Sequence, residues 1–177
     1  MRLFEGFYPT YAAKNTYSID FKKLWDEGFR GVIFDIDNTL VGHDLPADRR
    51  AYRFLKSLKE YGFRTMIVSN NEEPRVKSFA DKLECPYVYK ALKPRGTGYT
   101  KAKELMDLPC DQIICIGDQL FTDIWGANRA GMKSVLVGRL FYKEPPHIHF
   151  KRVLEFPVLH SYFRKRRREA HAKSRKY

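Results

Sequence analysis

The sequence has few cysteines and no long apolar run, and these absences narrow the classes of protein it can belong to. Its three cysteines form neither a CxxC pair nor a disulfide framework, which favours a reducing environment. No apolar segment approaches the roughly 20 residues that a membrane-spanning helix needs. The N-terminal residues lack an apolar stretch followed by a small-residue cleavage site, so no signal peptide is expected. We therefore expect a cytoplasmic protein without a membrane span.

Acidic residues are scarce relative to basic ones, and the excess is concentrated at one end of the chain. The formal net charge is +12, and residues 164–176 hold eight Lys or Arg against one Glu. We expect residues 161–177 to form a basic C-terminal tail. Three interpretations stay open for it: a solvated charged end, a segment that binds an anionic membrane surface together with apolar residues at 157–163, or an RNA-binding segment. No RNA-binding motif supports the last of these.

Apolar runs rich in β-branched residues alternate with segments of helical periodicity in a chain of 177 residues, enough for one domain. The expected strands are residues 31–36, 64–69, 86–89, 112–117 and 134–138. The expected helices are residues 18–28, 46–62, 72–83, 97–108 and 120–131. Parallel neighbours need crossover connections of this length, so we predict an α/β fold: a central parallel sheet of about five strands with helices on both faces.

Beyond residue 138 the pattern weakens. Pro145 and Pro146 predict a loop, and the histidines of the "HIH" sequence, His147 and His149, are expected on its surface without a metal site. Residues 156–173 could then form a last helix. Its apolar side chains would share one side; they are Val158, Leu159, Tyr162 and Phe163.

Polar side chains follow four of the predicted strands, where ligands gather in parallel sheets. These residues are Asp35, Asp37 and Thr39 after the first strand, Ser69 and Asn70 after the second, Lys93 after the third, and Asp118 and Asp123 after the fourth. Carboxylates that converge repel one another unless a hard cation such as Mg²⁺ neutralises them. A carboxylate nucleophile, an acid partner, a hydroxyl and a lysine are the groups that phosphoryl transfer uses.

Each of these residues also has an ordinary structural interpretation. Two aspartates after a strand are often solvated loop residues or helix caps. A lone serine is commonly a turn residue, a lone lysine lies on the surface, and aspartates favour the first turn of a helix. For a site to be absent, all of these explanations would have to hold independently at four successive strand ends. The combination therefore favours a shared site.

The four strand ends resemble the motifs of the haloacid dehalogenase superfamily of phosphohydrolases. "DIDNTL" at 35–40 matches its DxDx[TV] motif, "IVSN" at 67–70 its second, Lys93 its third, and "GDQLFTD" at 117–123 its GDxxxxD motif. The resemblance implies a three-layer Rossmann-like fold with the first strand beside the fourth. The motif core spans residues 31–137, in one phosphatase domain over residues 1–160.

The resemblance also implies a role for each motif residue. Asp35 would be the nucleophile and a Mg²⁺ ligand, and Asp37 the general acid and base, with its backbone carbonyl on the metal. Asp118 would complete the metal site, and Asp123 would orient Lys93 or a water on the metal. The phosphate-binding set would be Ser69, Asn70 and Lys93, with Thr39 supporting the first loop. An aspartate at position 37 favours a phosphatase over a dehalogenase.

Spacing between the motifs leaves no room for a large cap domain, because the predicted helices fill it. We therefore expect an open site that suits a bulky or surface-presented phosphate. "FYPTYAAKNTYSIDFKKLWDEG" and "KALKPRGTGYTKAKELMDL" are similar to the capless (subclass IIIA) bacterial YqeG-type branch. That branch is similar to mitochondrial and chloroplast enzymes that dephosphorylate phosphatidylglycerophosphate.

The resemblance thus implies a Mg²⁺-dependent phosphatase acting on a phospholipid headgroup, peripheral to the inner membrane face. Two alternatives stay open: a phosphatase for a soluble sugar or nucleotide phosphate, and an RNA- or ribosome-associated binding protein with little catalysis.

Overall fold

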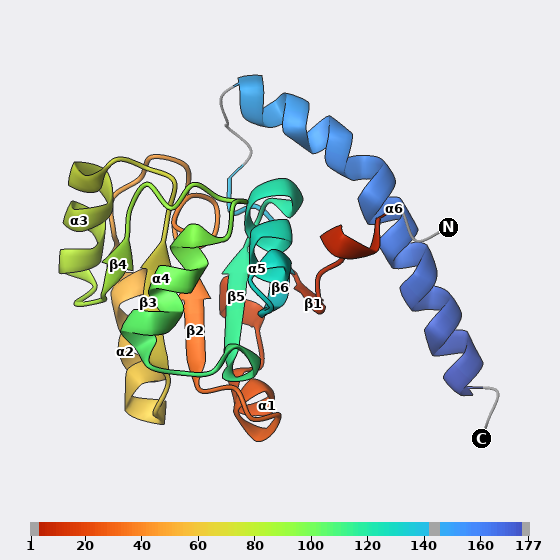
Figure 1. Cartoon of the computed structure of the whole chain (residues 1–177), viewed down its shortest axis with the longest axis horizontal. Coiled ribbons are helices and arrows are strands. Elements are labelled where there is room, and N and C mark those ends of the chain that lie inside the picture. The colour runs from red at the N-terminus through yellow and green to blue at the C-terminus, as the bar shows by residue number, and fades with distance from the viewer. Residues whose placement is uncertain (1–3, 142–145, 175–177) are drawn as a thin grey trace.

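The computed structural model describes residues 4–141 and 146–174 and contains one parallel sheet of six strands (Figure 1). The order across the sheet is β1-β6-β5-β2-β3-β4, and each strand runs parallel to its neighbours. The strands are β1 (Tyr11–Ala13), β2 (Gly31–Phe34), β3 (Arg64–Val68), β4 (Tyr87–Val88), β5 (Ile113–Gly117) and β6 (Lys133–Val137). The predicted pairing of the first motif strand with the fourth is confirmed, because β2 lies beside β5.

Helices cover both faces of the sheet, as predicted. They are α1 (Phe21–Asp26), α2 (Arg49–Tyr61), α3 (Glu73–Lys82), α4 (Thr97–Met106), α5 (Trp125–Arg129) and α6 (Pro146–Ser174). Phe34 of β2 faces a cluster shared with α1, α2 and α3, while its neighbour Ile33 faces a second cluster shared with α4 and α5. Alternate residues of each strand therefore fill the two cores. Within the described part of the chain, no cap domain interrupts this arrangement.

Helix α2 begins and ends at residues that suit helix caps. The Asp48 side chain accepts a hydrogen bond of 2.7 Å from the backbone N–H of Ala51 at the start of α2. Gly62 ends α2 with a φ of +113°, a conformation that glycine adopts without strain. Only Gly62 and Phe63 separate α2 from β3, so the chain enters β3 directly after the helix.

Three N-terminal and central details differ from the sequence prediction. The edge strand β1 was not expected, because three residues are too few to show a period. Residues 18–28 do not form one helix: a 3-10 turn, η2 (Thr16–Ser18), precedes α1, whose N-terminus is capped by Asp20. After β5, a π-helical turn, η4 (Leu120–Ile124), leads into the short α5.

The C-terminal region differs most. A single helix, α6, starts at Pro146, so the predicted surface loop around the HIH histidines is wrong; exposed His149 lies in the first turns of this helix. Pro145 lies outside the described residues. Val158 and Tyr162 are buried as expected, whereas Phe163 is 47% exposed. The helix continues through the predicted domain boundary at residue 160 and into the basic segment.

The first half of helix α6 packs against η4 at the end of β5, and its second half extends away from the sheet (Figure 1). A third apolar cluster joins Val158 of α6 to Leu120 and Ile124 of η4 and to Leu136 of β6. The N-terminal turn η1 (Glu5–Phe7) lies against the same helix, with aromatic side chains from residues 4–8 at the edge of this cluster. None of the described helices has both the length and the apolar character needed to cross a bilayer.

Candidate active site

The loop after β2 carries the first pair of candidate residues. The Asp35 backbone N–H donates to the Ile116 carbonyl over 3.0 Å, which joins the end of β2 to β5. The chain then turns, because the Ile36 carbonyl accepts bonds from the N–H groups of Thr39 and Leu40. Ile36 is fully buried in the core. Asp35 and Asp37, on either side of it, lie at the carboxyl end of β2.

Thr39 and the residue after it hold this loop in place through hydrogen bonds to η2. It is fully buried, and its carbonyl accepts a 2.7 Å hydrogen bond from the Thr16 hydroxyl. The next carbonyl, that of Leu40, accepts one of 2.5 Å from the Tyr17 hydroxyl. Turn η2 thereby holds the loop that carries the aspartates, a contact that sequence periodicity does not reveal.

A buried ion triad lies at the centre of the site. The Lys93 ammonium lies 2.6 Å from an Asp35 carboxylate oxygen and 2.7 Å from one of Asp123. All three side chains are nearly inaccessible to solvent. The structure therefore brings together residues from three different predicted motifs, which follow β2, β4 and β5.

Lys93 is held by its backbone as well as by its charge. Asn70, directly after β3, donates from its side chain to the Lys93 carbonyl over 3.1 Å. Its side-chain oxygen accepts from the Lys93 N–H over 2.7 Å. Ser69, the preceding residue, is buried, and its hydroxyl accepts a bond from the Asn71 N–H. Asn70 thus fixes the lysine loop, an alternative to the phosphate contact that the resemblance implies for it.

Asp37 has a different set of partners. One carboxylate oxygen accepts a 2.7 Å bond from the Asn71 side chain. The other accepts bonds from the Asp44 N–H, at 2.9 Å, and from the Arg75 guanidinium, at 3.3 Å. Sequence reasoning did not identify Arg75, which lies on α3 with no motif around it. These donors fix the direction of the Asp37 carboxylate.

Asp118 is held by helix α6. The Arg152 guanidinium forms an ion pair with one Asp118 carboxylate oxygen and donates to the Asp118 carbonyl over 2.5 Å. Glu155 pairs with the same guanidinium at 3.4 Å and accepts from the Leu120 N–H at 2.7 Å. The other carboxylate oxygen of Asp118, Oδ1, is buried and has no hydrogen-bond partner among the described residues. Neither Arg152 nor Glu155 was expected from the sequence.

Burial changes the titration of these groups. Desolvation raises the pKa of Asp35 to about 7, although Lys93 acts in the opposite direction. Burial also raises the pKa of Asp118 well above its usual range, against the effect of Arg152. Desolvation alone would lower the pKa of Lys93, but Asp123 and Asp35 outweigh it and raise that pKa. The lysine is thus held as a cation between the side chains of Asp35 and Asp123.

The acidic residues could accept a cation. Carboxylate oxygens of Asp35, Asp118 and Asp123 lie within 4.8 Å of one another, and Asp118 also carries the unpartnered Oδ1. An all-oxygen donor set suits a hard cation such as Mg²⁺. A second group, Asp37, His43 and Asp44, has the same spacing but includes an exposed aspartate. The residues present therefore fit the metal that the sequence predicted.

Comparison with known proteins places this site in a family. The model of the haloacid dehalogenase-like hydrolase family matches residues 43–131, about half of the chain. The probable phosphatase YqeG of Bacillus subtilis is 39% identical over 90% of this chain and 93% of its own length. Asp35 and Asp37 lie just before the segment that the family model matches.

Two further relatives carry the name phosphatidylglycerophosphate phosphatase 1. The chloroplastic protein of Chlamydomonas reinhardtii is 32% identical over 85% of this chain, and the chloroplastic/mitochondrial protein of Arabidopsis thaliana is 32% identical over 89%. The chain spans 60% and 48% of these two longer proteins, respectively.

A solved structure agrees with the fold. The cobalt-bound deoxy-D-mannose-octulosonate 8-phosphate phosphatase of Haemophilus influenzae superposes with a TM-score of 0.53 at 17% identity, covering 65% of this chain and 70% of that one. The predicted Rossmann-like fold and the resemblance to the superfamily are confirmed. The chain belongs to the haloacid dehalogenase-like hydrolase family, and it is a phosphatase of that family.

Proposed function

We propose that this phosphatase is a Mg²⁺-dependent phosphomonoester hydrolase that works through an aspartyl-phosphate on Asp35 and acts on phosphatidylglycerophosphate. The observation that carries the chemistry is the buried ion triad of Asp35, Lys93 and Asp123 beside the unpartnered Oδ1 of Asp118. A surface lysine would keep its ammonium group in solvent, whereas the Lys93 side chain is buried between two carboxylates. It suits a site that must hold a dianionic phosphoryl group.

Of the acidic residues described above, Asp35 and Asp118 would hold Mg²⁺ through their carboxylates, and the family resemblance adds the Asp37 backbone carbonyl. When bound, the ion would supply positive charge that offsets the phosphoryl oxygens and the clustered carboxylates. Asp118 is already oriented for this task, because Arg152 holds one of its oxygens and leaves Oδ1 without a protein partner.

In the first step, a carboxylate oxygen of Asp35 attacks phosphorus and the bond from phosphorus to the ester oxygen breaks. Asp37 gives a proton to the departing alkoxide. Lys93 places its positive charge beside the attacking carboxylate, and Asp123 keeps the lysine in position. The Ser69 hydroxyl lies after the neighbouring strand and would donate to a phosphoryl oxygen.

In the second step, Asp37 takes a proton from water as the water oxygen bonds to phosphorus. The bond from phosphorus to Asp35 breaks, which releases phosphate and restores the carboxylate. Asn71 and Arg75 hold the Asp37 carboxylate in one direction for both proton transfers. Proton transfer of this kind from a positioned group contributes about 10²–10⁴ in rate.

A lipid substrate is supported by two observations. The relatives in Chlamydomonas and Arabidopsis are named for phosphatidylglycerophosphate. The described residues also contain no cap domain that would enclose a small metabolite over the strand ends. A phosphate presented at a bilayer surface could reach such a site without leaving its lipid.

Phosphate release from phosphatidylglycerophosphate in mixed micelles, compared with a panel of sugar and nucleotide phosphates, tests the substrate. We expect kcat/KM for the lipid to exceed that for every soluble phosphate by at least about tenfold, a difference of about 1.4 kcal/mol in transition-state binding. A preference for the soluble panel would remove the lipid substrate. Absence of turnover with all substrates, together with tight RNA binding, would favour a binding protein.

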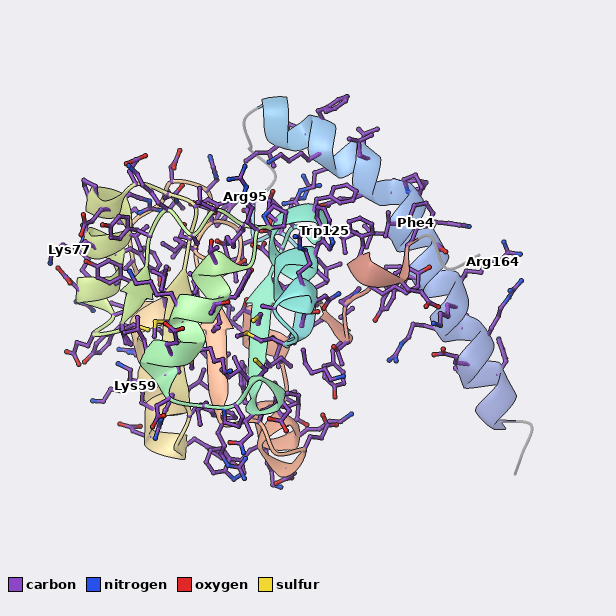
Figure 2. The ribbon with its side chains drawn as sticks, in the orientation of Figure 1. Phe4, Lys59, Lys77, Arg95, Trp125 and Arg164 are labelled. Atoms are coloured by element: carbon purple, nitrogen blue, oxygen red, sulfur yellow. The ribbon has the colours of Figure 1, made fainter. Side chains whose placement is uncertain are left out.

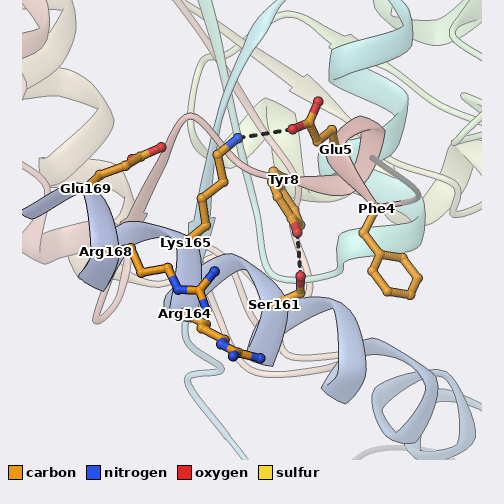
Figure 3. A pocket seen from close by; sticks show the side chains of 8 residues that line it. All are labelled: Phe4, Glu5, Tyr8, Ser161, Arg164, Lys165, Arg168 and Glu169. Carbon is orange, nitrogen blue, oxygen red and sulfur yellow. Dashed lines mark hydrogen bonds and ion pairs between the residues drawn. The ribbon is translucent and has the colours of Figure 1, made fainter. Parts of the chain in front are cut away.

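The C-terminal half of α6 supports action at an anionic membrane. Arg164, Lys165 and Arg168 line a cavity of about 390 Å³ beside the N-terminal residues (Figure 3). Lys165 lies 3.2 Å from Glu5, and Ser161 shares a 2.7 Å hydrogen bond with Tyr8, so the N-terminus braces the helix. Figure 2 places Arg164 on the opposite side of the molecule from Lys77 of α3. The basic segment that begins at Arg164 thus lies far from α3.

Truncation before Arg164 is expected to weaken binding to phosphatidylglycerol vesicles at least about tenfold, because each basic residue near an anionic surface contributes about 1 kcal/mol. Vesicle sedimentation measures the change. Lys56→Gln/Lys77→Gln, which removes two exposed lysines elsewhere, is the control and should bind nearly as well as the parent chain. Equal binding by the truncated and full-length chains would identify the tail as a solvated end.

A further inference from the structure

A second cavity lies between α6 and the sheet, directly beside the candidate active site. It has a volume of about 350 Å³, within the lower range of ligand sites. Its floor comes from the ends of β1 and β6, including Ala12, Ala13 and Val137, and its roof from Leu159 and Phe163 of α6. Asp118 and Arg152 close one end. The cavity therefore begins at a residue of the active site.

The position of this cavity follows from the strand order. Asp35 follows β2, Asp118 follows β5, and the cavity continues over β6 and β1, the next two strands in that direction. Neighbouring strands lie about 4.8 Å apart, so the distance from β2 to β1 is about 14 Å along the sheet edge. A molecule whose phosphate reaches Asp35 could thus place its remainder in the cavity.

The two ends of the cavity differ chemically. Arg152 lies at the polar end with Asp118 and Glu155, with which it pairs, and Arg139 joins the lining from the loop after β6. Away from them the lining is apolar, with Leu136 and Val137 from β6 opposite Leu159 and Phe163 from α6. The ring of Phe163 is 47% exposed, at the edge of this lining. Such a gradient matches a ligand with an anionic group at one end and hydrocarbon at the other.

We propose that this cavity, named here the α6 groove, binds the part of a phospholipid substrate that does not react. The phosphodiester would face Arg139 and Arg152, and the acyl-bearing glycerol with its first methylene groups would lie between Val137, Leu159 and Phe163. The volume is too small for whole acyl chains, so these leave the groove past Phe163. This inference rests on the proposed lipid substrate and names the surface that selects it. A sugar or a nucleotide would gain nothing from the apolar walls.

The test uses a monomeric lipid, which removes any contribution from vesicle binding. The full-length protein is assayed with dihexanoyl phosphatidylglycerophosphate below its micellar concentration and with p-nitrophenyl phosphate. Phe163→Ala removes an apolar wall, and Ala12→Leu fills the groove from an exposed position of β1. Phe150→Ala, another exposed phenylalanine of the same helix that is not among the residues lining the groove, is the matched control.

We expect both groove variants to lower the ratio of kcat/KM for the lipid to that for p-nitrophenyl phosphate about five- to tenfold. The loss should appear in KM, because binding far from phosphorus acts equally on the ground and transition states. Phe150→Ala should keep the parent ratio. A lipid that is cleaved with the parent ratio in both groove variants would overturn the groove alone. A lipid that is not cleaved, beside active turnover of p-nitrophenyl phosphate, would overturn the lipid substrate and the groove together.

Discussion

Asp35→Asn is expected to eliminate Mg²⁺-dependent phosphate release, with a loss of at least about 10⁴-fold in kcat. An amide oxygen has the same shape as a carboxylate oxygen but is a far weaker nucleophile, so the first step has no attacking group. The fold should persist, because the amide can still accept the hydrogen bond that Lys93 donates, and Lys93 keeps its ion pair with Asp123.

Steady-state turnover and thermal unfolding measure the two halves of this prediction. Asp44→Asn is the matched control, since Asp44 lies in the loop after Asp37 but its side chain is 75% exposed. The control should keep activity within about a few fold. Undiminished turnover by Asp35→Asn would refute the nucleophile, and loss of folding would require a second variant such as Asp35→Ser.

Lys93→Met is expected to lower the free energy of unfolding by about 3–5 kcal/mol and to reduce kcat/KM by at least about 10²-fold. The substitution removes the only cation within the ion triad and leaves Asp35 and Asp123 buried as neighbours. Protonation of a carboxyl relieves part of this penalty. Without Lys93 the pKa of Asp35 rises above the value of about 7 that it has in the parent chain. The difference in stability should therefore be largest in alkaline solution and shrink as pH falls towards about 7, below which Asp35 is neutral in both chains.

Urea unfolding at several pH values measures the stability of the Lys93 variant. Lys90→Met provides the control, because Lys90 pairs with Glu72 at 2.8 Å while both side chains are more than half exposed. Surface pairs of this kind contribute less than about 1 kcal/mol. Similar losses of stability in the two variants would contradict the buried-triad account.

The arrangement of Asp35, Lys93 and Asp118 could be predicted because strand ends of a parallel sheet converge. Asp35 and Asp118 follow apolar runs that are recognisable from their β-branched content, and Lys93 follows the short run at 86–89. The connections are long enough to make every crossover. The family resemblance implied two possible roles for Asp123, to orient Lys93 or to orient a water on the metal, and only the first corresponds to the ion triad. Its distances and its burial come from the structure.

Arg152 and Glu155 could not be predicted, because no local pattern links α6 to the loop after β5. Their contact with Asp118 and Leu120 spans more than 30 residues of sequence and depends on how the helix packs. Pro145 and Pro146 suggested a loop, yet proline is tolerated in the first turn of a helix, and α6 begins at Pro146. Strand β1 was missed for a related reason, since its three residues gain their place only by pairing with β6.

The central claim is that Asp35 carries the phosphoryl group between the two steps. The most direct measurement is rapid acid quenching of the enzyme during turnover of a radiolabelled substrate, followed by borohydride reduction and peptide mass spectrometry. We predict label on the protein that hydroxylamine removes, and conversion of residue 35 to homoserine. Label on another residue, or release of phosphate without any labelled protein while turnover proceeds, would contradict the account.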